Sequence, residues 1–208
     1  MLALFKQIRD SFGLELEILD LGGGFGIAYT DEDSTAQIEG FIKEISKIIT
    51  ETCLTEKMKL PAFILEPGRS IVAPAGITLY TVGSVKNIPN VRTYVGIDGG
   101  MTDNPRYALY GAKYTFEVAN AASERKTETV TIAGRCCESG DLLGKDVMLQ
   151  QAKAGDILAV LATGGYTYSM ASNYNRIPRP CVVFVKGGKD KLVIKRETYD
   201  DLIKNDIL

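Results

Sequence analysis

Five short stretches of the chain combine chemically capable side chains with glycines that leave the backbone accessible. In chain order they are Gly22–Gly26, Glu66–Arg69, Asp98–Arg106, Cys136–Asp141 and Thr163–Met170. Together they offer backbone amides for an anion, guanidinium groups for a carboxylate or phosphate, thiols beside carboxylates, and phenols. Each stretch also has a plainer interpretation, because tight turns, solvated connections and small buried cysteines use the same residue types.

The first two stretches each follow a predicted strand. An apolar run over Leu14–Leu21 leads into the glycine triplet, and Ala62–Leu65 leads into Glu66–Arg69. Ligands of a parallel α/β layer gather at the carboxyl ends of its strands, so both loops are expected on one rim. There the arginine can hold a phosphate or carboxylate through two hydrogen bonds, and the glutamate can orient or protonate a ring nitrogen. The triplet is not a GxGxxG fingerprint, because its spacing and the segment after it do not fit.

The other three stretches carry the remaining reactive groups. Asp98–Arg106 is rich in turn residues, and Tyr110 follows four residues later. Cys136–Asp141 places thiols, two carboxylates and a glycine directly after an apolar strand, and a thiol of suitable pKa can donate a proton. Tyr166 adds a phenol beside flexible backbone.

The elements that position the first two loops form a strand, a helix and a strand over residues 14–66. A capping box of Ser34 and Gln37 predicts the start of the helix, and one helical face then carries Ile38, Phe41, Ile42, Ile45, Ile48 and Ile49. Such a βαβ unit predicts a parallel strand pair. Another helix is expected to end before it, at Phe12, with Gly13 as its cap. Two strands are too few for a parallel sheet buried on both faces, so more chain or a partner is expected to complete the layer.

From about residue 70 the pattern changes to short β-rich runs separated by turns. These runs are 77–85, 93–97, 114–118, 128–132, 156–161, 181–186 and 191–194, and Gly187-Gly188 predicts a hairpin turn between the last two. Regularly spaced short strands predict a β-barrel or sandwich. The end of the chain, roughly 196–208, is expected to be helical. The sequence therefore predicts an α/β plus β protein with a boundary near residue 70.

Composition excludes several classes of protein. Lys+Arg is 24 and Asp+Glu is 26 in 208 residues, which argues against a nucleic-acid partner. There is no apolar run of membrane-spanning length and no leader-like start. Histidine is absent and no cysteine lies in a CxxC pair, so we expect no metal site and no histidine base. Four cysteines without a leader predict reduced thiols in a cytoplasmic protein.

Taken in order, the five stretches resemble the C-terminal half of the diaminopimelate decarboxylases, pyridoxal-phosphate enzymes of the alanine-racemase-like fold type. The resemblance runs through LDLGGGFGI, EPGR, DGGMTDNPR, CCESGD and GGYTYSMASNYN, over nearly the whole chain. It implies the last βα units of a TIM-type (β/α) barrel over residues 1–70 and a C-terminal β-barrel or sandwich domain over 71–208. It also implies decarboxylation of meso-2,6-diaminopimelate to L-lysine and CO2 with pyridoxal 5'-phosphate as the cofactor.

The resemblance assigns roles to particular residues of this chain. The cofactor would be held by Gly23, Gly24, Glu66, Pro67, Gly68, Arg69 and Tyr166. The amino-acid substrate would be held by Arg69, Arg106, Tyr110, Glu138 and Tyr166. Cys137 would be the general acid that protonates the carbon left by CO2. The family's site lies at a homodimer interface, and the Cys-Glu loop reaches in from the other subunit.

Two departures from the family pattern are visible. The family's Schiff-base lysine and its cofactor-stacking histidine belong to an N-terminal half that is absent from these 208 residues, so this chain alone is predicted to be inactive. Tyr107 stands where the family has proline after the arginine. Two other functions remain open: a related decarboxylase acting on ornithine, arginine or carboxynorspermidine, and a non-catalytic partner of a decarboxylase.

Overall fold

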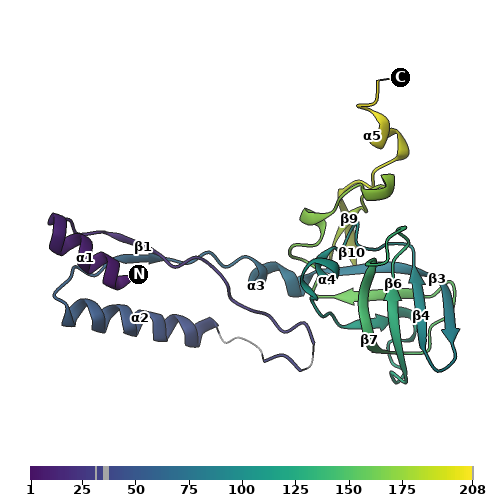
Figure 1. The fold of residues 1–208 in the computed structure, drawn as a ribbon, viewed down its shortest axis with the longest axis horizontal. Helices are drawn as coiled ribbons and strands as arrows, with labels where there is room; N and C mark the ends of the chain where they lie inside the picture. Colours follow the sequence, from purple (N-terminus) through teal and green to yellow (C-terminus); the bar gives the residue numbers. More distant parts are fainter. Residues whose placement is uncertain (31, 35–37, 208) are drawn as a thin grey trace. The chain divides into compact units, whose positions relative to one another are not determined.

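The computed structural model describes residues 1–30, 32–34 and 38–207, which form two compact units, Met1–Ile71 and Val72–Leu208 (Figure 1). Each unit is described by itself. Gln37, one half of the predicted capping box, lies outside the described residues. No helix in the described ranges has the length and apolar character needed to cross a membrane.

The first unit contains the predicted βαβ motif. Helix α1 (Leu2–Phe12) ends at Gly13, whose left-handed φ of 66° caps it as expected. Strands β1 (Ile18–Asp20) and β2 (Ala62–Ile64) pair in parallel, and α2 (Ile38–Thr55) connects them. The predicted parallel pair is therefore confirmed, although both strands are shorter than the apolar runs that predicted them.

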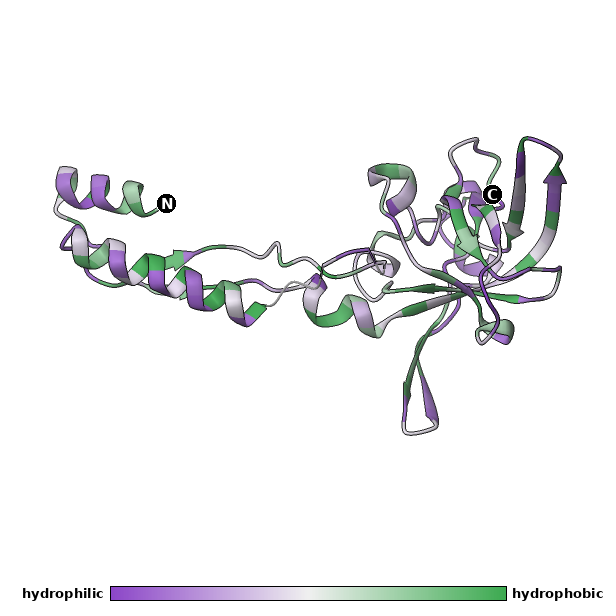
Figure 2. Ribbon diagram, turned by 90° about the horizontal axis from the view of Figure 1, so that it is seen from below, coloured by the Kyte–Doolittle hydropathy of each residue, from purple (hydrophilic) through white to green (hydrophobic). Residues whose placement is uncertain are grey.

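The core of this unit is small. Leu19, Ile49 and Cys53 are buried, and partly buried apolar residues pack around them: Leu2, Phe5, Leu21, Ile45, Met58 and Phe63. Other apolar side chains of the same elements stay exposed, including Ile18, Phe41 and Leu54. Figure 2 shows hydrophobic and hydrophilic residues alternating along α2. A two-stranded layer covers only part of the apolar surface that a parallel sheet normally buries.

The second unit is built on a six-stranded sheet with the strand order β5-β8-β3-β4-β6-β7. The strands are β3 (Ile77–Ile88), β4 (Arg92–Ile97), β5 (Phe116–Val118), β6 (Glu128–Ala133), β7 (Leu142–Leu149) and β8 (Ile157–Leu161). All neighbours are antiparallel except β4 and β6, which are parallel. The sheet curves into a barrel-like shape (Figure 1), as the regularly spaced short strands predicted.

The two ends of the sheet come together where Phe116 of β5 packs over Gly144 of β7. A Cβ added at Gly144 would lie 2.8 Å from Cε2 of Phe116 and 3.0 Å from Cγ1 of Val147. Phe116 is 2% exposed, so its ring fills the interior at this point. Only glycine leaves room for the ring, and this contact nearly closes the barrel.

We predict that Gly144→Ala destabilises the chain by about 1–3 kcal/mol, because the added methyl group must displace a buried ring. Urea unfolding measures the loss. Gly83→Ala in β3 is the matched control, since its nearest neighbour, the carbonyl oxygen of Gly96, would be 3.8 Å away. Equal stability of both variants would contradict this view of how the barrel closes.

The remaining elements are short. They are α3 (Arg69–Val72), α4 (Arg106–Tyr110), α5 (Tyr199–Ile203) and the 3-10 turns η1 (Ala73–Ala75), η2 (Ala119–Ala121), η3 (Tyr168–Met170) and η4 (Tyr174–Arg176). The predicted C-terminal helix is thus shorter than expected. Strands β9 (Val182–Lys186) and β10 (Lys189–Ile194) form the predicted hairpin, and both turn glycines have positive φ, 59° and 71°.

Glu197 ties the segment before α5 to the chain that precedes β9. Its carboxylate accepts hydrogen bonds from Nε and Nη2 of Arg179 at 2.9 and 2.6 Å, from the Arg179 amide, and from Nδ2 of Asn173. The Arg179 guanidinium is the main reason that the pKa of Glu197 is lowered to about 2. Folding therefore gains stability from this ionised group above its usual pKa of 4.5, and loses it as the pH falls toward about 2.

We predict that Glu197→Gln makes the free energy of unfolding fall less steeply between pH 4.5 and pH 2. Urea titrations across this range measure the slope. Glu124→Gln, at an exposed position, serves as the control. A slope as steep as that of the unsubstituted chain would show that Glu197 is not the group whose protonation weakens this fold.

Candidate functional site

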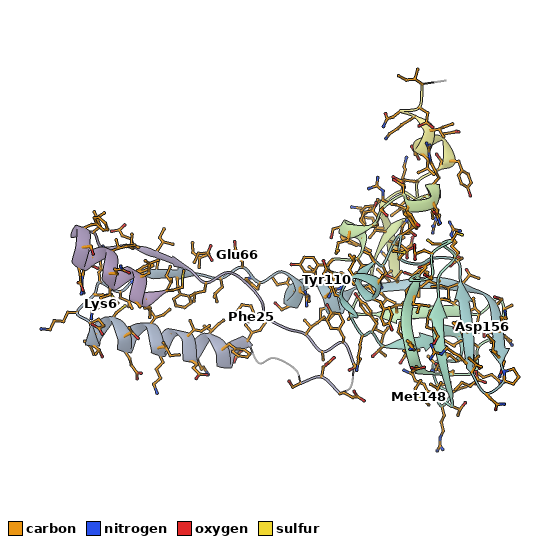
Figure 3. The ribbon with its side chains drawn as sticks, in the orientation of Figure 1. Lys6, Phe25, Glu66, Tyr110, Met148 and Asp156 are labelled. Carbon is orange, nitrogen blue, oxygen red and sulfur yellow. The ribbon has the colours of Figure 1, made fainter. Side chains whose placement is uncertain are left out.

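In the first unit, the loops after β1 and β2 lie against each other. The amide of Glu66 donates to the carbonyl of Gly22 at 2.8 Å, and the amide of Leu21 donates to the carbonyl of Ile64 at 3.0 Å. A Cβ at Gly23 would lie 2.4 Å from the carbonyl oxygen of Glu66, so only glycine permits this approach. Glu66, labelled in Figure 3, is exposed. The structure thus brings the two glycine-bearing loops together at the carboxyl ends of parallel strands.

This rim has groups suited to an anion. Gly24 has a φ of 89° and open space where a Cβ would be. Within the described ranges, the amides of Gly23 and Gly24 donate no hydrogen bond, and the buried hydroxyl of Ser70 has no partner. The guanidinium of Arg69 lies 6.0 Å from the centre of the Tyr29 ring. The amides belong to the loop after β1, and the arginine and hydroxyl follow the loop after β2; these are the kinds of donor that bind a phosphate group.

In the second unit, Arg106 lies against two tyrosine rings. Its Cζ is 5.9 Å from the ring centre of Tyr110 and 5.8 Å from that of Tyr166. Arg106 is 6% exposed, whereas the rings are 67% and 48% exposed. The two phenol rings therefore lie against a buried cation while much of their own surface stays exposed; Tyr110 is labelled in Figure 3. A guanidinium held in this way is suited to binding a carboxylate through two hydrogen bonds.

Tyr166 has an unusual backbone conformation. Its φ is 60°, in the left-handed region that residues with a side chain rarely adopt. The loop before it is closely packed, because a Cβ at Gly164 would lie 2.0 Å from the carbonyl oxygen of Val72. Backbone strain of this kind is often found at functional sites.

The loop Gly134–Asp141 carries both candidate thiols. Cys137 and Glu138 are exposed at its tip, and one Glu138 oxygen accepts from the Gly140 amide at 3.2 Å. Cys136 is partly buried, and burial together with the neighbouring Asp141 carboxylate raises its pKa to about 11. The two adjacent cysteines therefore differ in access to solvent.

The structure groups the predicted residues into three sets. Gly23, Gly24 and Glu66–Arg69 share one rim of the first unit. Arg106, Tyr110 and Tyr166 form one cluster of the second unit, and Cys137 and Glu138 share a loop of that unit. Hydrogen bonds join the segments of the second unit: Arg135 donates to the Gly99 carbonyl at 3.0 Å, and Ser172 to the Thr102 carbonyl at 2.8 Å.

Three buried polar groups in or next to these segments were not singled out from the sequence. Ser70 follows Arg69, and its hydroxyl is buried without a partner in the described structure. Asn104 is 1% exposed, and neither polar atom of its side chain has a partner among the described residues. Asp141 is 3% exposed and binds backbone amides of two loops. The only signal in the sequence was that each is a polar residue inside or directly after a stretch that already contained a candidate.

Comparison with known proteins gives a consistent result. Residues 25–164 match the family described as pyridoxal-dependent decarboxylase, C-terminal sheet domain. The diaminopimelate decarboxylase of Bacillus subtilis (strain 168) is 51% identical over 207 residues, which are 98% of this chain and 47% of that protein. The chain spans about half the length of the curated relatives it matches.

Solved structures extend the comparison. The crystal structure of diaminopimelate decarboxylase from M. jannaschii in complex with L-lysine has a TM-score of 0.85 and 38% identity, covering 100% of this chain and 46% of that chain. The lysine/ornithine decarboxylase of Vibrio vulnificus, solved with cadaverine, has a TM-score of 0.67 and 24% identity, covering 84% and 45%. The second likeness shows a shared fold alone.

Proposed function

Because this chain belongs to the pyridoxal-dependent decarboxylase family, we propose that it is the C-terminal half of a diaminopimelate decarboxylase. That enzyme would convert meso-2,6-diaminopimelate to L-lysine and CO2. The observation that carries the proposal is the buried Arg106 between two phenols, in the same unit as a loop with an exposed Cys137 and Glu138. Residues 1–70 would be the last part of a (β/α) barrel whose earlier strands lie in an N-terminal half.

Pyridoxal phosphate suits the rim of the first unit. The amides of Gly23 and Gly24, the Glu66–Arg69 loop and the hydroxyl of Ser70 would hold its phosphate. When bound, the cofactor supplies an electron sink for the bonding pair left behind as CO2 departs. The lysine that anchors it would come from the N-terminal half.

The substrate has an amino-acid group at each end, so one end can be held while the other reacts. Arg106 and Tyr110 would bind the distal carboxylate, because a guanidinium fork matches its two oxygens. Glu138 would bind the ammonium group of the same end. These residues would fix the position of the substrate through its distal end and would make no contact with the bond that breaks.

Cys137 would then complete the reaction by protonating the carbon that has lost CO2. Its S–H bond breaks as the new C–H bond forms, and solvent restores the thiol proton. In this proposal the enzyme is a homodimer, and the Cys137–Glu138 loop serves the site of the partner subunit. A thiol that must stay reduced is compatible with a cytoplasmic enzyme.

A full-length fusion tests this function: the present chain joined to the N-terminal half of the Bacillus subtilis relative. Turnover of meso-diaminopimelate is compared with turnover of ornithine, arginine and carboxynorspermidine. We expect diaminopimelate to react fastest, because Glu138 and Arg106 together match a second amino-acid end. Faster turnover of ornithine would overturn the substrate assignment, and a folded fusion inert on all four would favour a non-catalytic partner.

A further inference from the structure

Asp141 is a buried carboxylate that connects two loops of the second unit. One oxygen, Oδ1, accepts a hydrogen bond from the amide of Met101 at 2.6 Å. The other, Oδ2, accepts from the amide of Cys136 at 2.7 Å. Its own backbone closes the second loop, since the Gly134 amide donates to the Asp141 carbonyl at 2.8 Å. One side chain therefore holds the segment before Arg106 and the segment before Cys137.

The Asp141 carboxylate lies so close to two glycines that a side chain at either position would collide with it. A Cβ at Gly100 would lie 2.5 Å from its Oδ1, and a Cβ at Gly134 would lie 2.2 Å from its Oδ2. Throughout the described ranges, no lysine or arginine forms an ion pair with it. Two glycines thus leave room for a buried carboxyl group whose oxygens accept from backbone amides rather than from a cationic side chain.

The loop on the Met101 side is itself rigid. Asp103 is buried and accepts from the hydroxyl of Tyr80 and from the amide of Gly100 at 3.1 Å. The amide of Asn104 donates to the carbonyl of Gly100 at 2.9 Å. The position of Met101 is thereby linked to that of Arg106, five residues further along.

We propose that Asp141 is a positioning residue that fixes the Cys137–Glu138 loop relative to the loop that carries Arg106. This inference rests on the proposed function, in which Cys137 gives up a proton in the site of the partner subunit and Arg106 holds the substrate in the site of its own subunit, so the spacing of the two loops sets how the thiol meets the neighbouring site. Asp141 touches neither substrate nor cofactor. It acts through the amide next to Cys137, so a displaced carboxylate moves the thiol away from the carbon it must protonate.

The substitution Asp141→Asn separates this role from simple burial. An amide has the same shape, but its NH2 group must face the amide of either Met101 or Cys136, and two donors cannot bond to each other. In the full-length fusion we expect kcat to fall about a hundredfold, as for other small displacements of reacting groups. Asp156→Asn is the matched control, because Asp156 is 5% exposed and accepts from the amide of Lys153 and from Asn120 (Figure 3).

A double substitution shows whether Asp141 works through the thiol. If it does, Cys137→Ala should cost little more in the Asp141→Asn background, and the double variant should be within about threefold of Cys137→Ala alone. Losses that multiply would overturn the inference. A fusion whose Cys137→Ala variant is fully active would instead overturn the proposed function, so the two failures are distinguishable.

Thiol alkylation gives a readout that needs no cofactor. Iodoacetamide labelling of the cofactor-free fusion, followed across pH and assigned by mass spectrometry, is expected to modify Cys136 with an inflection near 11. In Asp141→Asn the inflection should move down, since the nearby negative charge is gone. Asp156→Asn should leave it in place, and an inflection unmoved by Asp141→Asn would count against the inference.

A second variant tests the same inference if Asp141→Asn fails to fold. Gly100→Ala keeps the charge of Asp141 but pushes the carboxylate away, and should lower kcat in the same way. If neither variant folds, the unsubstituted fusion decides: a Cys136 inflection at the ordinary 9.0 would contradict both the burial of this thiol and the closeness of the Asp141 carboxylate, and so the inference.

Discussion

Replacing Cys137 with alanine in the full-length fusion is expected to lower kcat for meso-diaminopimelate by about two to four orders of magnitude. This is the usual contribution of a positioned general acid. The thiol is exposed at the tip of its loop, so it is accessible to a reacting carbon supplied by another part of the enzyme. Steady-state kinetics with CO2 or lysine detection measures the loss.

Cys136→Ala is the matched control for that substitution. Cys136 is partly buried and its pKa is raised to about 11, which makes its thiol a reluctant proton donor near neutral pH. We expect kcat within about threefold of the unsubstituted fusion, since the Cys136 amide that binds Asp141 is retained. A large loss from Cys136→Ala with none from Cys137→Ala would reverse the assignment of the two thiols.

Replacing Arg106 with methionine is expected to lower kcat/KM by roughly thirty- to several thousandfold. Removing one partner of a buried, hydrogen-bonded charge pair costs about 2–5 kcal/mol, and about 1.4 kcal/mol is a factor of ten. Because the distal carboxylate is far from the bond that breaks, we expect most of the change in KM. Initial rates over a range of diaminopimelate concentrations separate the two parameters.

Two further variants test whether the effect at Arg106 comes from its shape as well as its charge, and whether it is specific to this arginine. Arg106→Lys keeps the charge but loses the planar fork and its stacking between Tyr110 and Tyr166, so it should recover only part of the affinity. Arg92→Met removes an arginine of β4 that pairs with the exposed Asp146 and should leave kcat/KM unchanged. An unaltered KM in Arg106→Met would show that this cation does not hold the substrate.

Local sequence patterns correctly predicted those elements that form between segments close together in the sequence. The parallel pair of β1 and β2 follows from a strand, helix, strand order, and the β9–β10 hairpin follows from Gly187-Gly188. Strand β7 was missed because Gly144, Lys145 and Asp146 interrupt its apolar pattern. The pairing with β6 is irregular there, and Asp146 has a φ of 55°.

Helix α4 was missed for a different reason. The segment after Asp98 contains many turn residues, and it was interpreted as a long loop. Its signals were nevertheless present, since Pro105 precedes the helix and Gly111 ends it in a left-handed conformation. The many turn residues led to the prediction of a loop, whereas the segment forms a five-residue helix in which Arg106 lies against the Tyr110 ring.

The role of Asp141 could not be predicted from the sequence. Its partners Met101 and Cys136 are 40 and 5 residues away, and its burial depends on how two distant loops fold together. The same holds for the hydroxyl of Ser70, which is buried only because of the packing around it. Motif order was enough to propose Cys137 and Arg106 as reactive groups, whereas the buried residues around them could be identified only from the structure.

The most direct test of the account measures decarboxylation of meso-diaminopimelate by the 208-residue chain alone and by the full-length fusion, both with added pyridoxal phosphate. We expect lysine and CO2 from the fusion and none from the chain, because the lysine proposed to anchor the cofactor would be supplied by the added half. Turnover by the chain alone would contradict the claim that it is one half of the enzyme. A folded, cofactor-loaded fusion that leaves diaminopimelate unchanged would contradict the proposed function itself.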